Sequence, residues 1–205
     1  MKVLLINGSP HEKGCTYTAL AEVAAQLETH GIRTVFFHIG TRLVRGCLAC
    51  GRCRDGFCAF DDDGCVECAR LMRAADGIVV GSPVYYAGPN GQLTSLLDRV
   101  FYCGSPWLVN KPAAAVVSAR RGGASATYDR LLKYFMKTSM PIVTSQYWNS
   151  VHGMTPEDVR QDKEGLQTMR TLANNMAWLL KCIDHAKGVV PLPENEPLTP
   201  TNFIR

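Results

Sequence analysis

Short apolar segments alternate with segments of helical periodicity along most of this sequence. The apolar segments have the length and composition of buried strands, and they are residues 3–6, 34–39, 77–80, 113–117 and 141–144. The helical segments are residues 17–29, 66–75, 90–102, 128–137 and 164–185. Strands that are separated by helices form a parallel sheet covered on both faces. Right-handed crossovers then predict an α/β doubly wound sheet of five strands in the order 2-1-3-4-5.

The length of 205 residues is enough for one domain with a sizeable core. We expect this single domain to span residues 1–190. A cysteine-rich insert without clear periodicity lies within it, at about residues 45–68. Residues 191–205 contain four prolines, and we expect an extended tail there.

Charge and hydropathy argue against two classes of partner. The formal net charge is only +4 and the basic residues form no run longer than a pair, so we expect no nucleic-acid partner. The apolar segments are far shorter than a membrane span, and the chain enters its first strand without a signal peptide, so we expect no membrane association and a cytoplasmic location. Nine cysteines in such a protein favour metal or redox chemistry over structural disulfides.

Three loops of small and polar residues follow predicted strands 1, 3 and 4, at residues 8–15, 81–90 and 118–125. Ligands of doubly wound sheets bind at this edge, next to the point where the strand order reverses. The first loop matches neither the dinucleotide nor the triphosphate motif, but Ser9, Thr16 and Thr18, with Lys13 or His11, suit a terminal phosphate monoester. An ordinary strand–loop–helix connection is the alternative.

The other two loops suit a flat ligand. Tyr85 or Tyr86 can pack against a ring, although packing in the core or in an interface is the alternative for both. In the third loop, glycines permit close approach of the backbone, and Arg120 or Arg121 can face an anion unless they only face solvent. Asn90 is expected to cap the following helix in either case.

Several motifs together resemble one family. They are Gly8-Ser9-Pro10 with Gly14-x-Thr16, Gly81-Ser82-Pro83-Val84-Tyr85-Tyr86, and Gly91-Gln92-Leu93 followed by Asp98-Arg99. This combination resembles the flavodoxin-like NAD(P)H-dependent FMN reductases over residues 1 to about 145. The cysteine segment, Gly46-Cys47-Leu48-Ala49-Cys50-Gly51-Arg52-Cys53 followed by Cys58 and Asp61-Asp62-Asp63, is similar to that of their iron–sulfur flavoprotein branch.

The resemblance implies an FMN site formed by the three loops, in which the flavin carries the chemistry and no side chain is catalytic. The implied phosphate loop contains Ser9, Pro10, His11, Cys15, Thr16, Tyr17 and Thr18. The implied ring-binding residues are Ser82, Pro83, Val84, Tyr85, Tyr86 and Gly88, and the pocket is completed by Ser118, Ala119, Arg120, Arg121, Gly122 and Gly123. Two residues depart from the family pattern: Cys15 stands where Asn is common, and His11 where Arg is common.

By the same resemblance, we expect an oxidoreductase that takes hydride from NADH or NADPH and passes electrons to a small molecule or a protein. A homodimer or homotetramer is expected, with residues near Trp148 and Asn149 reaching the partner subunit's flavin. Two alternatives stay open: an electron-transfer or redox-sensing flavoprotein without rapid NAD(P)H turnover, and a nucleotide-binding module without redox chemistry.

Four cysteines with the spacing Cys47-x2-Cys50-x2-Cys53-x4-Cys58 are unlikely to be placed so densely by chance. A closely similar spacing binds [4Fe–4S] in the family members that carry a cluster. A zinc site and metal-free redox thiols remain alternatives. Cys65 and Cys68 form a second C-x-x-C within a predicted helix and are equally compatible with packing, and Cys103 and Cys182 are expected to be small apolar fillers.

Overall fold

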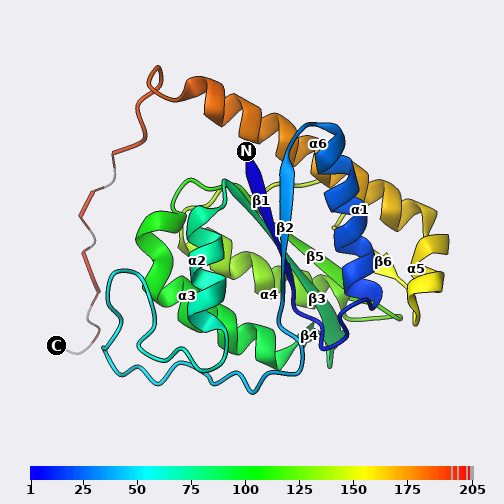
Figure 1. Ribbon diagram of the computed structural model, residues 1–205, viewed down its shortest axis with the longest axis horizontal. Helices are drawn as coiled ribbons and strands as arrows, with labels where there is room; N and C mark the ends of the chain where they lie inside the picture. Colours follow the sequence, from blue (N-terminus) through cyan, green and yellow to red (C-terminus); the bar gives the residue numbers. More distant parts are fainter. Residues whose placement is uncertain (195, 198, 202, 204–205) are drawn as a thin grey trace.

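The computed structural model describes residues 1–194, 196–197, 199–201 and 203 (Figure 1). A central sheet has the order β2-β1-β3-β5-β6, and each of these neighbouring strands pairs in parallel. The strands are β1 (Lys2–Asn7), β2 (Arg33–His38), β3 (Gly77–Tyr85), β5 (Ala113–Ala119) and β6 (Ser150–His152). The predicted order of the five parallel strands is therefore confirmed. A two-residue strand, β4 (Gly88–Pro89), folds back antiparallel onto the end of β3.

Helices cover both faces of the sheet (Figure 1), as the apolar pattern predicts. Successive residues of β1 alternate between two separate core clusters: Leu4 and Ile6 point to one, and Val3 and Leu5 to the other. The first cluster is closed by α2 (Cys65–Ala74), α3 (Gly91–Leu108) and α4 (Ala124–Lys137). The second is closed by α1 (Cys15–Thr29), α5 (Pro156–Gln161) and α6 (Lys163–Ala186).

The fifth predicted strand, at residues 141–144, is confirmed only as a single bridge. Ile142 pairs in parallel with Ala113 of β5, whose N–H donates to the carbonyl of Pro141 over 2.9 Å and whose carbonyl accepts from the N–H of Val143 over 2.8 Å. The chain then leaves the sheet and returns as β6, whose Ser150 pairs with Val117. A loop at residues 145–149 thus interrupts the edge strand. It is closed by the hydroxyl of Ser145, which donates to Oδ1 of Asn149 over 2.7 Å.

Two segments lie outside these layers. Residues 40–64 form an irregular segment before α2, in which Arg54 and Phe57 make a single antiparallel bridge. The expected tail, 191–205, includes residues 195, 198, 202, 204 and 205, which lie outside the described residues; its described residues form neither helix nor strand. None of the helices among the described residues is long and apolar enough to cross a membrane.

Candidate functional site

Asn7, the last residue of β1, holds the first loop from inside. Its side chain is buried; Oδ1 accepts from the N–H of Ser9 over 3.1 Å, and Nδ2 donates to the carbonyl of Glu12 over 3.0 Å. The carbonyl of Ser9 is also 2.9 Å from Nε2 of His38, at the end of β2. Neither Asn7 nor His38 was expected in the site. The sequence signal that could have identified Asn7 is a polar residue directly after a predicted apolar strand.

The N-terminal turn of α1 follows this loop and is open to an anion. Gly14 is the N-cap and supplies no side-chain cap, and the first turn contains no acidic residue. The unpaired N–H groups and the helix dipole at such an end favour a bound anion. Thr18 lies in this turn and donates its hydroxyl to the carbonyl of Gly14 over 3.1 Å. Pro10 and His11 lie on the outer side of the loop.

The two remaining predicted residues of this turn are engaged within the protein. Cys15 is partly buried, its Sγ lies 3.8 Å from the carbonyl of Gly153, and burial raises the pKa of its thiol. The ring of Tyr17 packs against that of Phe36, with centroids 5.2 Å apart. The side chains of Cys15 and Tyr17 are therefore engaged elsewhere, and only their backbone groups are available to the first loop.

A hydrogen bond between hydroxyl groups joins the first loop to the third. Oγ1 of Thr16 and Oγ of Ser118 are 2.8 Å apart, and both side chains are buried. Ser118 precedes Ala119, the last residue of β5, and the exposed Arg120 and Arg121 follow. The structure thus brings the predicted residues of the two loops together at the carboxyl edge of the sheet.

The second loop is a tight hairpin between β3 and β4. Tyr86 and Ala87 form its tip, both with positive φ, at 50° and 56°. Non-glycine residues rarely adopt this conformation, and such strain often occurs at functional sites. Tyr86 is fully exposed and Tyr85 is 45% exposed, so packing of these tyrosines in the core is excluded.

Hydrogen bonds at the base of the hairpin connect it to the first loop. The hydroxyl of Ser82 accepts from the N–H of Asn90 over 3.0 Å and donates to the carbonyl of Pro83 over 2.8 Å. Asn90 accepts from the N–H of Gln92, as expected for the cap of α3, and its Nδ2 also donates to the carbonyl of Gly8 over 2.7 Å. Asn90 is therefore both a helix cap and a link between two loops.

The third loop packs directly against the hairpin. Gly123 has a φ of +89°, and a Cβ atom there would lie 2.9 Å from Cα of Ala87 and 3.0 Å from Cγ1 of Val84. The neighbouring Gly122 has open space around it. Only Gly123, then, requires glycine for the two loops to meet.

The four clustered cysteines form a second candidate site. Cys47, Cys50, Cys53 and Cys58 line one hollow, whose wall is completed by Phe60 and by Arg99 and Tyr102 from α3. Cys47 and Cys50 are exposed, and Cys53 and Cys58 are partly buried. Burial raises the pKa of Cys53, and the nearby thiols of Cys58, Cys50 and Cys47 raise it further.

The remaining cysteines lie apart from this hollow or beneath it. Cys65 and Cys68 are fully buried in the core, and burial raises the pKa of Cys65 to about 12, so both are packing residues. Cys103 is also buried, as expected. The expectation for Cys182 is wrong, since this residue is exposed on α6. Across the described part of the chain, no three His, Cys, Asp or Glu side chains converge closely enough to hold a metal ion.

Of the two residues expected near the partner subunit's flavin, Asn149 is fully buried within its own chain, and the N–H of Val117 donates to its carbonyl over 2.9 Å, so its side chain is not at the surface. Trp148 remains exposed.

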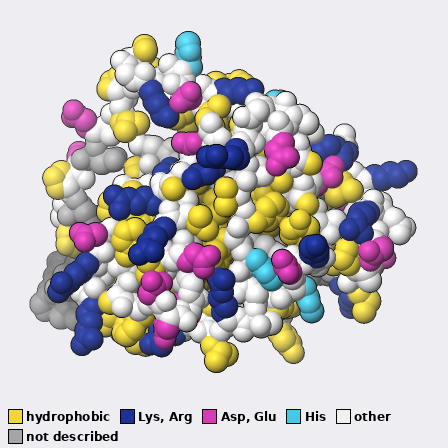
Figure 2. All heavy atoms as spheres, in the orientation of Figure 1, with side chains coloured by type: hydrophobic (Ala, Val, Ile, Leu, Met, Phe, Trp, Pro, Cys, Tyr) yellow, Lys and Arg dark blue, Asp and Glu magenta, His cyan; other side chains and the backbone are white. Residues whose placement is uncertain are grey.

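On the face seen in Figure 2, Lys and Arg side chains are interspersed with Asp and Glu.

Comparison with known proteins finds relatives that match this chain over most of its length. The chain is 34% identical over 192 residues to an iron-sulfur flavoprotein of Methanocaldococcus jannaschii, a match that covers 89% of this chain and 99% of that protein. It is 33% identical over 189 residues to the iron-sulfur flavoprotein of Methanosarcina thermophila, with 89% and 97% covered.

Solved structures share the fold at low sequence identity. RosB with a bound riboflavin-phosphate intermediate has a TM-score of 0.70 at 14% identity, with 100% of this chain and 96% of that chain covered. The apo form of the NADH:FMN oxidoreductase EMOB has a TM-score of 0.64 at 16% identity, with 86% and 88% covered. The sequence profile described as NADPH-dependent FMN reductase matches residues 1–155. With this match and the iron-sulfur flavoproteins as relatives over nearly their full length, the chain belongs to the NADPH-dependent FMN reductase family.

Proposed function

We propose that the protein is an FMN-dependent oxidoreductase that takes hydride from NADH or NADPH and passes electrons to a small molecule or a protein. The observation that carries this proposal is the meeting of three loops at the carboxyl edge of the sheet, where the Thr16–Ser118 hydrogen bond joins the first and third loops next to the open end of α1. Such an edge is where doubly wound sheets bind their ligands. Bound FMN would accept one hydride, which carries two electrons, and release electrons singly or in pairs.

The first loop fits the phosphate of FMN. Backbone N–H groups of residues 15–17 lie at an uncapped helix end without a carboxylate in its first turn, and the hydroxyls of Ser9 and Thr18 flank it. Ser9 Oγ already accepts from the N–H of His11 over 3.1 Å, which orders the loop. Because Cys15 and Tyr17 turn their side chains to other contacts, we infer that backbone and hydroxyl groups provide most of the phosphate affinity.

The second and third loops fit a flat ring. The strained turn at Tyr86 and Ala87 is held by its contact with Gly123, so the hairpin is ordered before a ligand binds. Tyr85 and Tyr86 offer exposed aromatic faces, and Arg120 and Arg121 offer positive charge at the end of β5. A positive charge there would favour the flavin in its reduced, anionic state.

The hollow lined by the four cysteines fits an iron–sulfur cluster in its chemistry. Its potential ligands are thiols only, and no carboxylate or imidazole lines it among the described residues. Thiolate-rich sites select iron–sulfur clusters or zinc, and the two relatives described above are named iron-sulfur flavoproteins. We therefore propose Cys47, Cys50, Cys53 and Cys58 as ligands of [4Fe–4S]. Zinc and free thiols are the competing outcomes.

An absorption spectrum of anaerobically purified protein, with iron, zinc and sulfide analysis, tests both cofactors. Flavin bands with about four iron and four sulfide per chain are expected, as the cluster's formula requires. Flavin bands with zinc, or with no metal, would reject the cluster but keep the flavin. A colourless protein that does not take up added FMN would favour a nucleotide-binding module and reject the flavin proposal.

Anaerobic mixing with NADH or NADPH tests the reaction. The proposal expects rapid bleaching of the flavin absorbance by at least one of them. If both leave the flavin oxidised, the protein is an electron-transfer or redox-sensing flavoprotein instead. The same measurement, made separately with each nucleotide, determines the preference between NADH and NADPH.

A further inference from the structure

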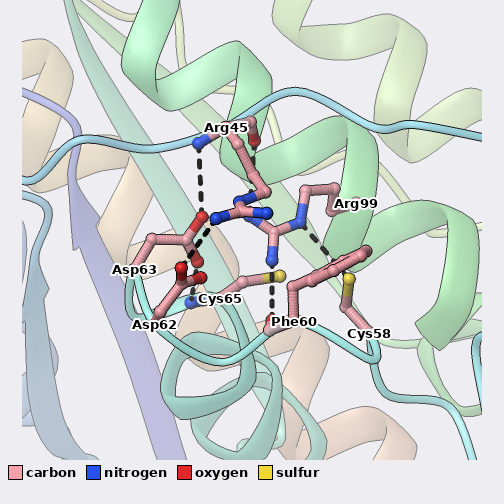
Figure 3. A network of polar contacts seen from close by, with 7 residues as sticks. All are labelled: Arg45, Cys58, Phe60, Asp62, Asp63, Cys65 and Arg99. Carbon is pink, nitrogen blue, oxygen red and sulfur yellow. Dashed lines mark hydrogen bonds and ion pairs between the residues drawn. The ribbon is translucent and has the colours of Figure 1, made fainter.

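Arg99, in the middle of α3, is buried beneath the cysteine segment (Figure 3). Its side chain is only 2% exposed, and the hydrogen bonds that it donates among the described residues all go to that irregular segment. Nε donates to Sγ of Cys58 over 3.4 Å, and Nη2 donates to the carbonyl of Phe60 over 2.7 Å. Nη1 donates to the carboxylate of Asp63 and, over 3.3 Å, to the carbonyl of Arg45. One side chain thus ties together the two ends of the segment and one of the four cysteines.

Asp63 completes this network from the other side. Its carboxylate pairs with Arg99 and accepts from the N–H groups of Arg45, over 3.2 Å, and Cys65, over 3.3 Å. Both partners of the ion pair are 2% exposed at their side chains, so each would be costly to bury alone. Because the carboxylate balances the guanidinium, the pair adds little net charge beside the hollow. The specific contribution of Arg99 is then the N–H group that it directs at the sulfur of Cys58.

A second contact holds the middle of the segment. Gly56 has a φ of +82°, and a Cβ atom there would lie 2.1 Å from Nε1 of Trp107, so the backbone of the Arg54–Phe57 turn lies directly on the indole. The ring of Phe57 also packs near Trp107, with centroids 6.3 Å apart. The half of the segment that carries Cys53 and Cys58 is therefore anchored to α3.

The other half is not anchored in this way. Cys47 and Cys50 are exposed, and Leu48 between them is 62% exposed. The hollow consequently has a fixed wall with Cys53 and Cys58 and an outer wall with Cys47 and Cys50. This division explains why four thiols line one hollow without three of them converging within the described chain.

We infer that Arg99 is a positioning residue for the proposed cluster, which fixes Cys58 at the wall of the hollow and donates a hydrogen bond to its sulfur. This inference rests on the proposed function, in which Cys58 is a cluster ligand. Hydrogen bonds to ligand sulfur, together with net charge and solvent exposure, set the reduction potential of such clusters. A donor stabilises the more electron-rich state, so Arg99 raises the potential.

Three variants distinguish a role of Arg99 in positioning Cys58 from a general loss of folding. The double variant Arg99→Met/Asp63→Asn removes both buried charges, so that neither is left unpaired, and leaves no donor for Cys58. Arg99→Lys keeps the charge but lacks the guanidinium fork. Arg45→Gln is the matched control, because the Arg45 side chain lies on the same segment and pairs with the exposed Asp62, and among the described residues it donates no hydrogen bond to a cysteine.

Two measurements are made on each protein. Redox titration of the reconstituted holoprotein gives the midpoint potentials of cluster and flavin separately, and trypsin cleavage after Arg52 and Arg54 reports how firmly the segment is held. We expect Arg99→Met/Asp63→Asn to bind FMN normally, to be cleaved several-fold faster, and to show a more negative cluster potential with an unchanged flavin potential. Arg99→Lys should lie between it and the unaltered protein, and Arg45→Gln should match the unaltered protein.

The outcomes distinguish this inference from the proposed function. If the double variant retains FMN but no longer retains iron and sulfide, while Arg45→Gln retains them, positioning by Arg99 is supported. If the double variant has the potential and cleavage rate of the unaltered protein, the inference is wrong and the cluster proposal stands. If the unaltered protein takes up no iron and sulfide, the cluster proposal fails and the inference fails with it.

Discussion

The hydroxyl groups of Thr16 and Ser118 lie 2.8 Å apart, although 102 residues separate them along the chain. One is in the first turn of α1, and the other is at the end of β5. Their hydrogen bond fixes the distance between the proposed phosphate loop and the loop that completes the ring pocket. Both groups are buried, so each depends on the other for a partner.

Thr16→Val preserves the shape of the side chain but removes this hydrogen bond. It leaves the Ser118 hydroxyl buried without its partner, which costs about 1–3 kcal/mol of stability. Because the two loops lose their connection, we expect the dissociation constant of FMN to rise about tenfold, measured by flavin fluorescence titration. Thr29→Val, at the far end of α1, is the control, since that exposed hydroxyl bonds to the carbonyl of Gln26 within the same helix. Equal FMN affinity in Thr16→Val and the control would contradict this role.

Gly123→Ala should separate the third loop from the hairpin. Its φ of +89° disfavours any side chain, and the new Cβ would meet the backbone of Ala87 at 2.9 Å. The left-handed conformation alone costs about 1–2 kcal/mol, so we expect roughly tenfold weaker FMN binding in calorimetry. Gly122→Ala is a closely matched control because nothing lies within 4 Å of its added Cβ. The prediction is wrong if the two variants bind FMN equally.

Replacement of each clustered cysteine by serine tests the metal proposal residue by residue. Cys47→Ser, Cys50→Ser, Cys53→Ser and Cys58→Ser should each reduce iron and sulfide content by more than half, about the loss expected when one of four ligands is missing. FMN content should stay the same, because none of these residues lies in the three loops. Cys182→Ser replaces another exposed cysteine, on α6, and should retain the cluster. Retention of iron in all four variants would contradict the assignment.

The Asp63–Arg99 pair should stabilise the fold except in acid. Burial alone would raise the pKa of Asp63, but the hydrogen bonds from Arg99 and from the N–H groups of Arg45 and Cys65 outweigh it and hold the pKa below its ordinary value of 3.8. The contribution of the pair is therefore complete above about pH 4–5. It is lost as the pH falls through the folded-state pKa, because the unfolded chain takes up the proton first.

Urea unfolding of the metal-free protein between pH 6 and pH 3 measures this dependence. We expect the unfolding free energy to fall below about pH 4, and Arg99→Met/Asp63→Asn to show a shallower fall. Asp61→Asn changes an exposed carboxylate two residues away and should keep the slope of the unaltered protein. Identical acid slopes in the double variant and the unaltered protein would show that the pair does not control acid stability.

The sequence predicted the strand order and the three loops because both depend on local patterns. Apolar runs, helical periodicity and small residues at strand ends are visible within a few residues of each other. The interrupted fifth strand was not predictable in this way. Residues 141–144 have strand composition, but Val117 donates to the carbonyl of Asn149, and this distant pairing determines where the edge strand continues.

The contacts of Arg99 could not be predicted for a similar reason. The cysteine segment has no periodicity, and Asp63 and Cys58 lie 36 and 41 residues before Arg99 in the chain. The hairpin tip is a different case, because positive φ values usually indicate Gly or Asn, whereas Tyr86 and Ala87 occupy them here. There the surrounding contacts, above all Gly123 against Ala87, override the local preference.

We predict that Tyr147 and Trp148 lie at an interface between copies of this chain. They occupy the loop that interrupts the edge strand, their ring centroids are 4.6 Å apart, and each is more than half exposed. Exposed aromatic pairs of this kind are typical of protein interfaces. We expect a homodimer or homotetramer in sedimentation velocity, and Tyr147→Ser/Trp148→Ser should dissociate it. Leu43→Ser, which replaces another highly exposed apolar residue, should leave it intact. A monomeric unaltered protein at every concentration would contradict the prediction.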